Sequence, residues 1–159
     1  MRRYSFLFLP FIVLQGCDGK LPLELPPPPS PPTIVNLEIG TSFDLNADSK
    51  GKGTPVMLRV YELREISSFN SSGFLTLFNY DQAVLGTDMG RKQELLLQPG
   101  EGRNLNLYPD DTMHYLGFFA AFRQLDTAQW RVVTIIQANI TQTINVTLTN
   151  NRLVVNLAP

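Results

Sequence analysis

Cysteine and histidine are almost absent from this sequence, which contains one of each, Cys17 and His114. A single cysteine excludes an internal disulfide, and a single histidine cannot build the His₂ or His₃ ligand set of a zinc site. Asp110 and Asp111 lie just before His114, but we interpret them as a turn that leads into a strand. A Ser-His-Asp triad would need His114, and no nucleophile-elbow motif supports one. We therefore expect no catalytic site, no metal and no cofactor.

Charged residues are also scarce, at 17% of the chain against about 25% in ordinary soluble domains. The 13 basic residues are nearly balanced by 14 acidic ones, and asparagine, threonine and glutamine occupy many polar positions. This balance makes nucleic acids and anionic membrane surfaces poor partners. A surface with so few charges is suited to packing inside an assembly.

The N-terminus carries the features of a secretory signal. Two arginines precede a nine-residue apolar run, Phe6 to Leu14, which is too short to span a bilayer permanently. Gln15 and Gly16 then lead to Cys17, and this ending resembles a bacterial lipoprotein signal, whose cysteine is diacylated and becomes the mature N-terminus. The resemblance implies that residues 1–16 are removed and that Cys17 is acylated. An ordinary signal followed by an incidental cysteine is the alternative.

Proline dominates the next segment, residues 17–32. Seven of the twelve prolines of the chain lie in residues 18–32, which favours an extended polyproline II conformation. At about 3.1 Å per residue, this stretch would reach about 45 Å. We interpret it as a tether that holds a folded domain, residues 33–159, away from a lipid surface.

From Thr33 onward the hydrophobic residues follow a period of two, which is typical of β-strands. In the first strand Val35, Leu37 and Ile39 alternate with polar residues, and Phe43 and Leu45 continue this stripe after a slip near Gly40. The other predicted strands are 56–63, 93–97, 103–108, 115–123, 130–137, 142–149 and 152–157. About eight strands at hairpin spacing predict an all-β fold, an antiparallel β-sandwich.

Other segments of the domain break this pattern. Residues 68–86 suit one or two short helices that pack on the sheets, and 115–123 suits a central strand buried on both faces. Pro99-Gly100 is the pair typical of a type II turn, whereas Asn150-Asn151 would tolerate the left-handed backbone of a tight hairpin. We expect Trp130 to lie in the core between the two sheets.

The segment between the first two strands lacks any periodicity, contains two glycines and ends in a proline, so we predict an exposed, flexible loop. A loop of this kind can adapt to a partner, although most such loops are only solvated. Its residues are Asn46, Ala47, Asp48, Ser49, Lys50, Gly51, Lys52, Gly53, Thr54 and Pro55.

The mature chain contains, in order, the blocks 53–63, 68–70, 85–86, 98–101, 115–117, 120–123 and 130–131, together with Phe74 and Leu77. Behind a lipoprotein signal, these blocks resemble the TssJ lipoproteins of bacterial type VI secretion systems. The resemblance implies a non-enzymatic, transthyretin-like sandwich at the periplasmic face of the outer membrane. It also implies binding to the periplasmic C-terminal region of TssM, in a complex with TssL, through the loop at residues 46–55.

One alternative remains open for the location of the protein and one for its function. Asp18 follows the acylated cysteine, and in enterobacterial sorting an aspartate there tends to retain a lipoprotein in the inner membrane. The alternative function is that of a periplasmic lipoprotein that binds a small ligand or a metal. A deep apolar cavity with converging polar groups would distinguish it.

Overall fold

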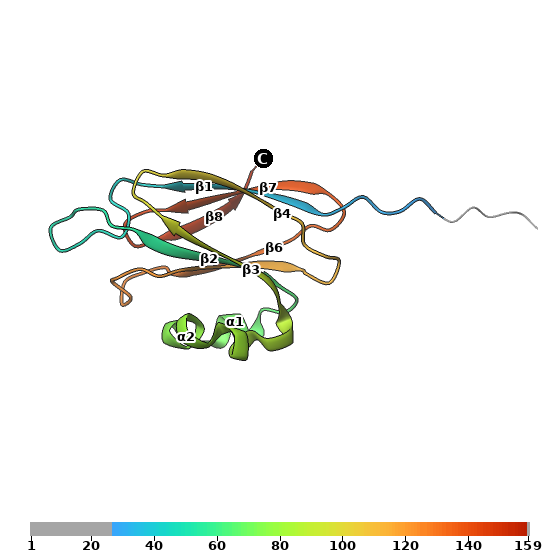
Figure 1. The fold of residues 1–159 in the computed structure, drawn as a ribbon, viewed down its shortest axis with the longest axis horizontal. Coiled ribbons are helices and arrows are strands. Elements are labelled where there is room, and N and C mark those ends of the chain that lie inside the picture. The colour runs from blue at the N-terminus through green and yellow to red at the C-terminus, as the bar shows by residue number, and fades with distance from the viewer. Residues whose placement is uncertain (1–26, 159) are drawn as a thin grey trace, which may run out of the picture.

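The computed structural model describes residues 27–158, so the signal, Cys17, Asp18 and the first part of the tether lie outside the described residues. Eight strands form two four-stranded sheets that pack face to face (Figure 1). The first sheet has the order β4-β1-β7-β8 and the second β3-β2-β5-β6. The strands are β1 (Ile34–Thr41), β2 (Val56–Leu63), β3 (Met89–Leu97), β4 (Gly102–Leu107), β5 (Tyr115–Ala120), β6 (Arg131–Ile135), β7 (Thr141–Leu148) and β8 (Leu153–Leu157).

The predicted eight-stranded sandwich is confirmed, with one correction to its strand directions. β1 pairs with β7 in parallel, with Val35 opposite Gln142, whereas all the other paired strands of the two sheets are antiparallel. The reason is topological. After β6 the chain crosses back to the first sheet at the end where β1 begins, and Ile34 N donates to Ile140 O there at 3.0 Å. β7 therefore runs in the same direction as β1.

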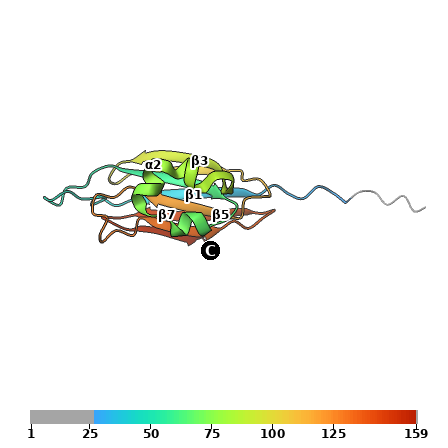
Figure 2. The same ribbon diagram turned by 90° about the horizontal axis from the view of Figure 1, so that it is seen from below.

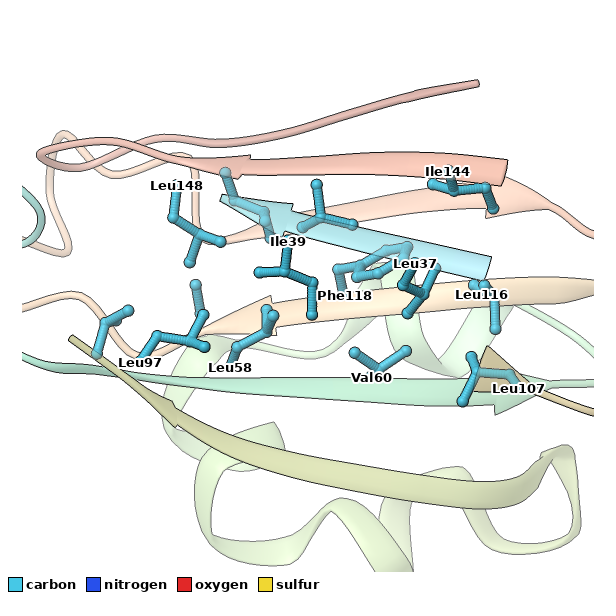
Figure 3. Close-up of a cluster of buried hydrophobic side chains, with 14 of the residues drawn as sticks. Leu37, Ile39, Leu58, Val60, Leu97, Leu107, Leu116, Phe118, Ile144 and Leu148 are labelled. Atoms are coloured by element: carbon cyan, nitrogen blue, oxygen red, sulfur yellow. The ribbon is translucent and has the colours of Figure 1, made fainter. Parts of the chain in front are cut away.

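The main core lies between the two sheets, as the period-two pattern requires. Alternate side chains of β1, β2, β5 and β7 point inward from both sheets and interlock (Figure 3). Burial of these side chains supplies most of the stabilisation of the sandwich, at about 25 cal/mol per Å² of apolar surface. The labelled members of this core are Leu37, Ile39, Leu58, Val60, Leu97, Leu107, Leu116, Phe118, Ile144 and Leu148.

A helical insertion between β2 and β3 covers the outer face of the second sheet (Figures 1 and 2). It consists of α1 (Ser67–Ser71), α2 (Phe74–Leu85) and the short 3₁₀-helix η1 (Gly86–Asp88), which confirms the prediction for residues 68–86. A second hydrophobic cluster fills this layer, with Tyr61, Phe69, Leu77 and Phe119 fully buried. β5 is thus buried on both faces, as predicted.

Two arginines of the second sheet hold the helices in place. Arg131 Nη1 donates to Phe69 O at 2.7 Å and to Ser72 O at 2.9 Å, at the C-terminus of α1. Arg59 Nη1 donates to Phe78 O at 2.9 Å, just before α2 is interrupted by the non-helical backbone of Tyr80. A cation at the C-terminal carbonyls of a helix complements the helix dipole. Each short helix is therefore stabilised by the sheet rather than by its own length.

A buried carboxylate completes this layer. Asp81 of α2 accepts hydrogen bonds from the Tyr61 hydroxyl at 2.9 Å, Lys92 Nζ at 2.9 Å and Arg59 Nη1 at 3.3 Å. Burial acts to raise the pKa of Asp81, but the hydrogen bonds from Lys92 and Tyr61 and the nearby positive charges outweigh it and lower that pKa. Asp81 therefore remains ionised and joins α2 to β2 and β3.

The prediction that Trp130 lies between the two sheets is wrong. Trp130 is partly exposed just before β6, where its ring packs edge-on against Phe74 of α2 at 5.3 Å and Phe119 of β5 at 5.5 Å. Trp130 borders the main core but belongs with the rings under the helical insertion. A period-two pattern cannot tell which apolar layer a side chain joins when both faces of the sheet are covered.

Of the two predicted turns, the one at Pro99-Gly100 is confirmed and the one at Asn150-Asn151 is corrected. Gly100 has a φ of +75°, and Glu101 N donates to Gln98 O at 3.2 Å, as expected for a type II turn. Neither Asn150 nor Asn151 has a positive φ, so the left-handed backbone predicted for them is wrong. Asparagines at 46 and 139 adopt it instead, with φ values of 48° and 63°.

A buried acidic residue on β2 yields a test of pH-dependent stability. Glu62 is only 4% exposed, and burial raises the pKa of its carboxyl group, opposed by Arg91 and reinforced by Asp110. Ionised Glu62 therefore destabilises the folded state at neutral pH, whereas below the ordinary glutamate pKa of about 4.3 the group is protonated in both states. We predict that Glu62→Gln raises the free energy of unfolding at pH 7 and that this gain disappears near pH 4. Urea denaturation at both pH values measures the difference, and equal stability at pH 7 would contradict the prediction.

Candidate functional site

The loop between β1 and β2 lies at the end of the sandwich opposite to the tether (Figure 1). The tether leads directly into β1, and β1 runs the length of the sandwich before the chain turns into this loop. The distal end, as we call this pole, is formed by the connections at residues 42–55, 98–101, 121–130 and 149–152. The predicted loop, residues 46–55, projects beyond the other connections.

The base of the loop is held by Asn46, whose side chain is a hub of hydrogen bonds. Its Nδ2 donates to Pro55 O at 2.9 Å and to Thr54 Oγ1 at 3.1 Å, while its Oδ1 accepts from Arg123 N at 2.8 Å. Asn46 N also donates to Asn150 O at 2.7 Å. Asn46 is only 5% exposed, so these bonds are partly shielded from water, and they join three connections of the distal end.

The tip of the loop is also ordered. Asp48 Oδ1 accepts from Lys50 N at 2.8 Å and from Lys52 N at 3.0 Å, and Gly51, with a φ of +77°, donates its N–H to Asp48 O. The backbone N–H groups of Lys52 and Lys50 lower the pKa of Asp48. These hydrogen bonds argue against the predicted flexibility of the loop. The loop has a defined frame, and Ser49, Lys50 and Lys52 are exposed on it.

The chemistry available elsewhere in the described residues is limited. Within residues 27–158 no group of three or more histidine, cysteine, aspartate or glutamate side chains could hold a metal ion. His114 is exposed just before β5, and Asp110 Oδ1 accepts from the backbone N–H of Thr112 at 2.9 Å and from its hydroxyl at 2.5 Å. Asp110 thus closes a turn before the strand, as the sequence suggests.

A groove of about 540 Å³ lies near the tether end, between β1, β7 and β8. It is open, its lining is mainly polar, and Glu38 is the one charged residue among the lining residues. This is not the deep apolar cavity that would favour a small-ligand carrier. Among the helices of residues 27–158, none is both long and hydrophobic enough to cross a membrane.

Comparisons with known proteins bear on the same domain. The family model described as "Type VI secretion lipoprotein, VasD, EvfM, TssJ, VC_A0113" matches residues 33–151. The crystal structure of the T6SS lipoprotein TssJ1 from Pseudomonas aeruginosa is 33% identical, with a TM-score of 0.79, over 81% of this chain and 98% of that chain.

Two further solved structures are similar over 80% of this chain and 98% of theirs. A chain of a type VI membrane complex is 25% identical, with a TM-score of 0.67. A chain in the structure described as the T6SS protein TssM C-terminal domain from EAEC is 24% identical, with a TM-score of 0.61, a likeness that bears on the fold alone. A search among curated protein sequences finds no match.

The Asn46 hub yields a stability test. Asn46→Ala leaves the Arg123 N–H and the Pro55 carbonyl without their partner, and each such loss costs about 1 to 3 kcal/mol. Alanine is also disfavoured at a positive φ, by about 1 kcal/mol relative to glycine. We therefore expect Asn46→Ala to be more destabilising than Asn46→Gly, and Ser49→Ala to have no effect. Chemical denaturation measures all three, and a wild-type midpoint for Asn46→Ala would refute the role of the hub.

Proposed function

The chain belongs to the TssJ family of type VI secretion lipoproteins, which are structural rather than enzymatic, and we propose that its distal end binds TssM. The partner region is the periplasmic C-terminal part of TssM, in a complex that also contains TssL. In this arrangement the acylated Cys17 holds the protein at the periplasmic face of the outer membrane. The observation that carries the proposal is the placement of tether and loop at opposite ends of β1.

The polarity of the domain suits a connector between a membrane and a partner protein. Lipid attached at Cys17 would lie at the far end of the tether, and residues 27–33 leave the sandwich along its long axis (Figure 1). The loop at residues 46–55 then points away from the lipid surface, into the space where a periplasmic partner is accessible. Loops on a rigid scaffold are common binding elements for this reason.

The structure of the loop also suits binding. The hydrogen bonds of Asn46 and Asp48 define the backbone before any partner arrives, so less conformational entropy is lost on association. The exposed Lys50 and Lys52 provide positive charge at the tip. Charges at an interface act mainly on association rate and specificity.

Placement in the outer membrane is the finer part of the proposal. It is supported by family membership and by the lipoprotein signal at residues 14–17. The effect of Asp18 on sorting can be read from membrane fractions separated by density in the native host, where a predominant inner-membrane pool would overturn this placement.

The interface test removes the exposed side chains of the loop and keeps its frame. In the detergent-solubilised lipoprotein, Ser49→Ala, Lys50→Ala and Lys52→Ala together should weaken binding to the periplasmic fragment of TssM by about tenfold, because charge complementarity is lost. The thermal midpoint should not change, since these side chains make no contact that holds the frame.

The matched control carries three alanines on or beside the helical insertion, at the exposed residues Glu65, Thr76 and Gln82. We expect wild-type affinity for this control. If instead the control weakens binding and the loop variant does not, the interface lies on the insertion.

The lipid attachment is tested by Cys17→Ser. We expect this variant to incorporate no fatty acid analogue in metabolic labelling, because a serine offers no thiol for acylation, and to accumulate as uncleaved or soluble protein. Wild-type protein that takes up no label would show that the N-terminus is an ordinary signal peptide.

A further inference from the structure

Among residues 27–158, Phe43 is the most exposed of the large hydrophobic side chains, at 86%. It lies in the β1–β2 connection, two residues after the end of β1 and three residues before Asn46. By the alternation of β1 it should point into the core, as Val35, Leu37 and Ile39 do, and the expectation that it continues their stripe is wrong. Leu45 does return to the core and is fully buried. The chain therefore turns out of the sheet in a way that exposes one aromatic ring.

Two glycines lie against Phe43, one against its ring and one against its backbone. A Cβ atom on Gly100 would lie 2.6 Å from Phe43 Cε1, so the ring rests directly on the β3–β4 turn. A Cβ atom on Gly53 would lie 2.2 Å from the Phe43 carbonyl oxygen, a distance that real side chains do not adopt. The loop thus passes against the backbone of Phe43 where only glycine fits. Phe43 and the loop form one continuous surface.

Hydrogen bonds fix the backbone on the N-terminal side of Phe43. Ser42 N donates to Leu148 O at 2.9 Å, and Gly100 N donates to Ser42 O at 3.1 Å. The Thr41 hydroxyl donates to Gln98 O at 2.6 Å and accepts from Glu101 N at 2.8 Å. The ring is therefore presented on a rigid support formed by β1, β7 and the β3–β4 turn.

We infer that Phe43 is the aromatic anchor of the partner interface and enters an apolar pocket of the periplasmic fragment of TssM. This inference rests on the proposed function and extends it from a charged loop to a specific contact. A rigid aromatic side chain buries a large apolar area with little loss of conformational entropy, and such residues dominate binding energy at interfaces. The polar side chains at 49–52 would then form the rim that surrounds this contact.

Exposure alone does not distinguish Phe43, because single apolar residues are common on protein surfaces. Leu75 and Tyr80 are also well exposed, but on the helical insertion, and Ile135 is 63% exposed at the tether end of β6. Of these four residues, Phe43 combines exposure of the side chain with a rigid support and a backbone carbonyl that lies against Gly53 of the loop. Ile135 therefore serves as the matched control.

The test measures affinity of the detergent-solubilised lipoprotein for the periplasmic fragment of TssM. Phe43→Ala should weaken binding by about 30-fold, equivalent to about 2 kcal/mol, and Phe43→Leu should weaken it less, because leucine keeps part of the apolar contact. Ile135→Ala should bind as wild type does. The thermal midpoints should stay near that of wild type, since the Phe43 ring is exposed.

The outcomes separate the anchor from the proposed function. Wild-type affinity for Phe43→Ala, together with weakened binding of the triple loop variant, overturns the anchor and leaves the proposed interface intact. Wild-type affinity for both variants, or no binding by the wild-type protein, overturns both. A large drop in thermal midpoint for both Phe43 variants shows a structural residue and also overturns the anchor.

Discussion

The pairing of β1 on both of its edges is the constraint on which the functional arrangement depends. β1 forms six register pairs with β4 on one side and eight with β7 on the other, while Val35, Leu37 and Ile39 are buried in the core beneath it. A strand held in this way cannot slip or rotate without loss of both ladders and the core contacts. The tether and the loop, which continue β1 at its two ends, are therefore held at opposite poles of the domain.

The helical insertion is required by the composition of the second sheet. Tyr61, Leu63 and Phe119 point away from the main core, and without a cover they would form an exposed apolar patch. The insertion provides that cover, but its helices are too short to be stable alone. Arg59 and Arg131 supply the missing contacts from the sheet, and the Tyr61 hydroxyl of β2 donates to Asp81 of α2. The helices lie over the sheet and leave the loop at residues 46–55 uncovered (Figure 1).

Much of the fold follows from local patterns that act over a few residues. The period of two predicts the eight strands, and the break in that period predicts the helical insertion. The Pro99-Gly100 pair predicts its turn, because glycine is the residue that most readily adopts the positive φ of a type II turn. The parallel pairing of β1 with β7 could not be found in this way, since it depends on the route of the chain between sheets. The layer of Trp130 cannot be predicted from the pattern either, because burial on both faces removes the polar alternation that would assign a side.

The candidate site was predictable in position but not in structure. The lack of periodicity at 46–55 locates the loop, yet the buried Asn46 and the Asp48 turn depend on partners far along the chain, such as Arg123 and Asn150. Alternation predicts a buried Phe43 because it assumes that the strand continues, whereas β1 ends at Thr41.

These departures from local rules are not scattered over the domain. An outward phenylalanine at 43, a buried asparagine with positive φ at 46 and a glycine required by close backbone contact at 53 all occur in one connection. Each has a cost in isolation: lost apolar burial, backbone strain or lost chain entropy. The connection must cross from the first sheet to the second, but that crossing alone does not require an exposed aromatic ring or a buried asparagine with positive φ. A loop that must hold a fixed shape for a partner does give a reason for both, since natural sequences break local rules mainly at functional sites.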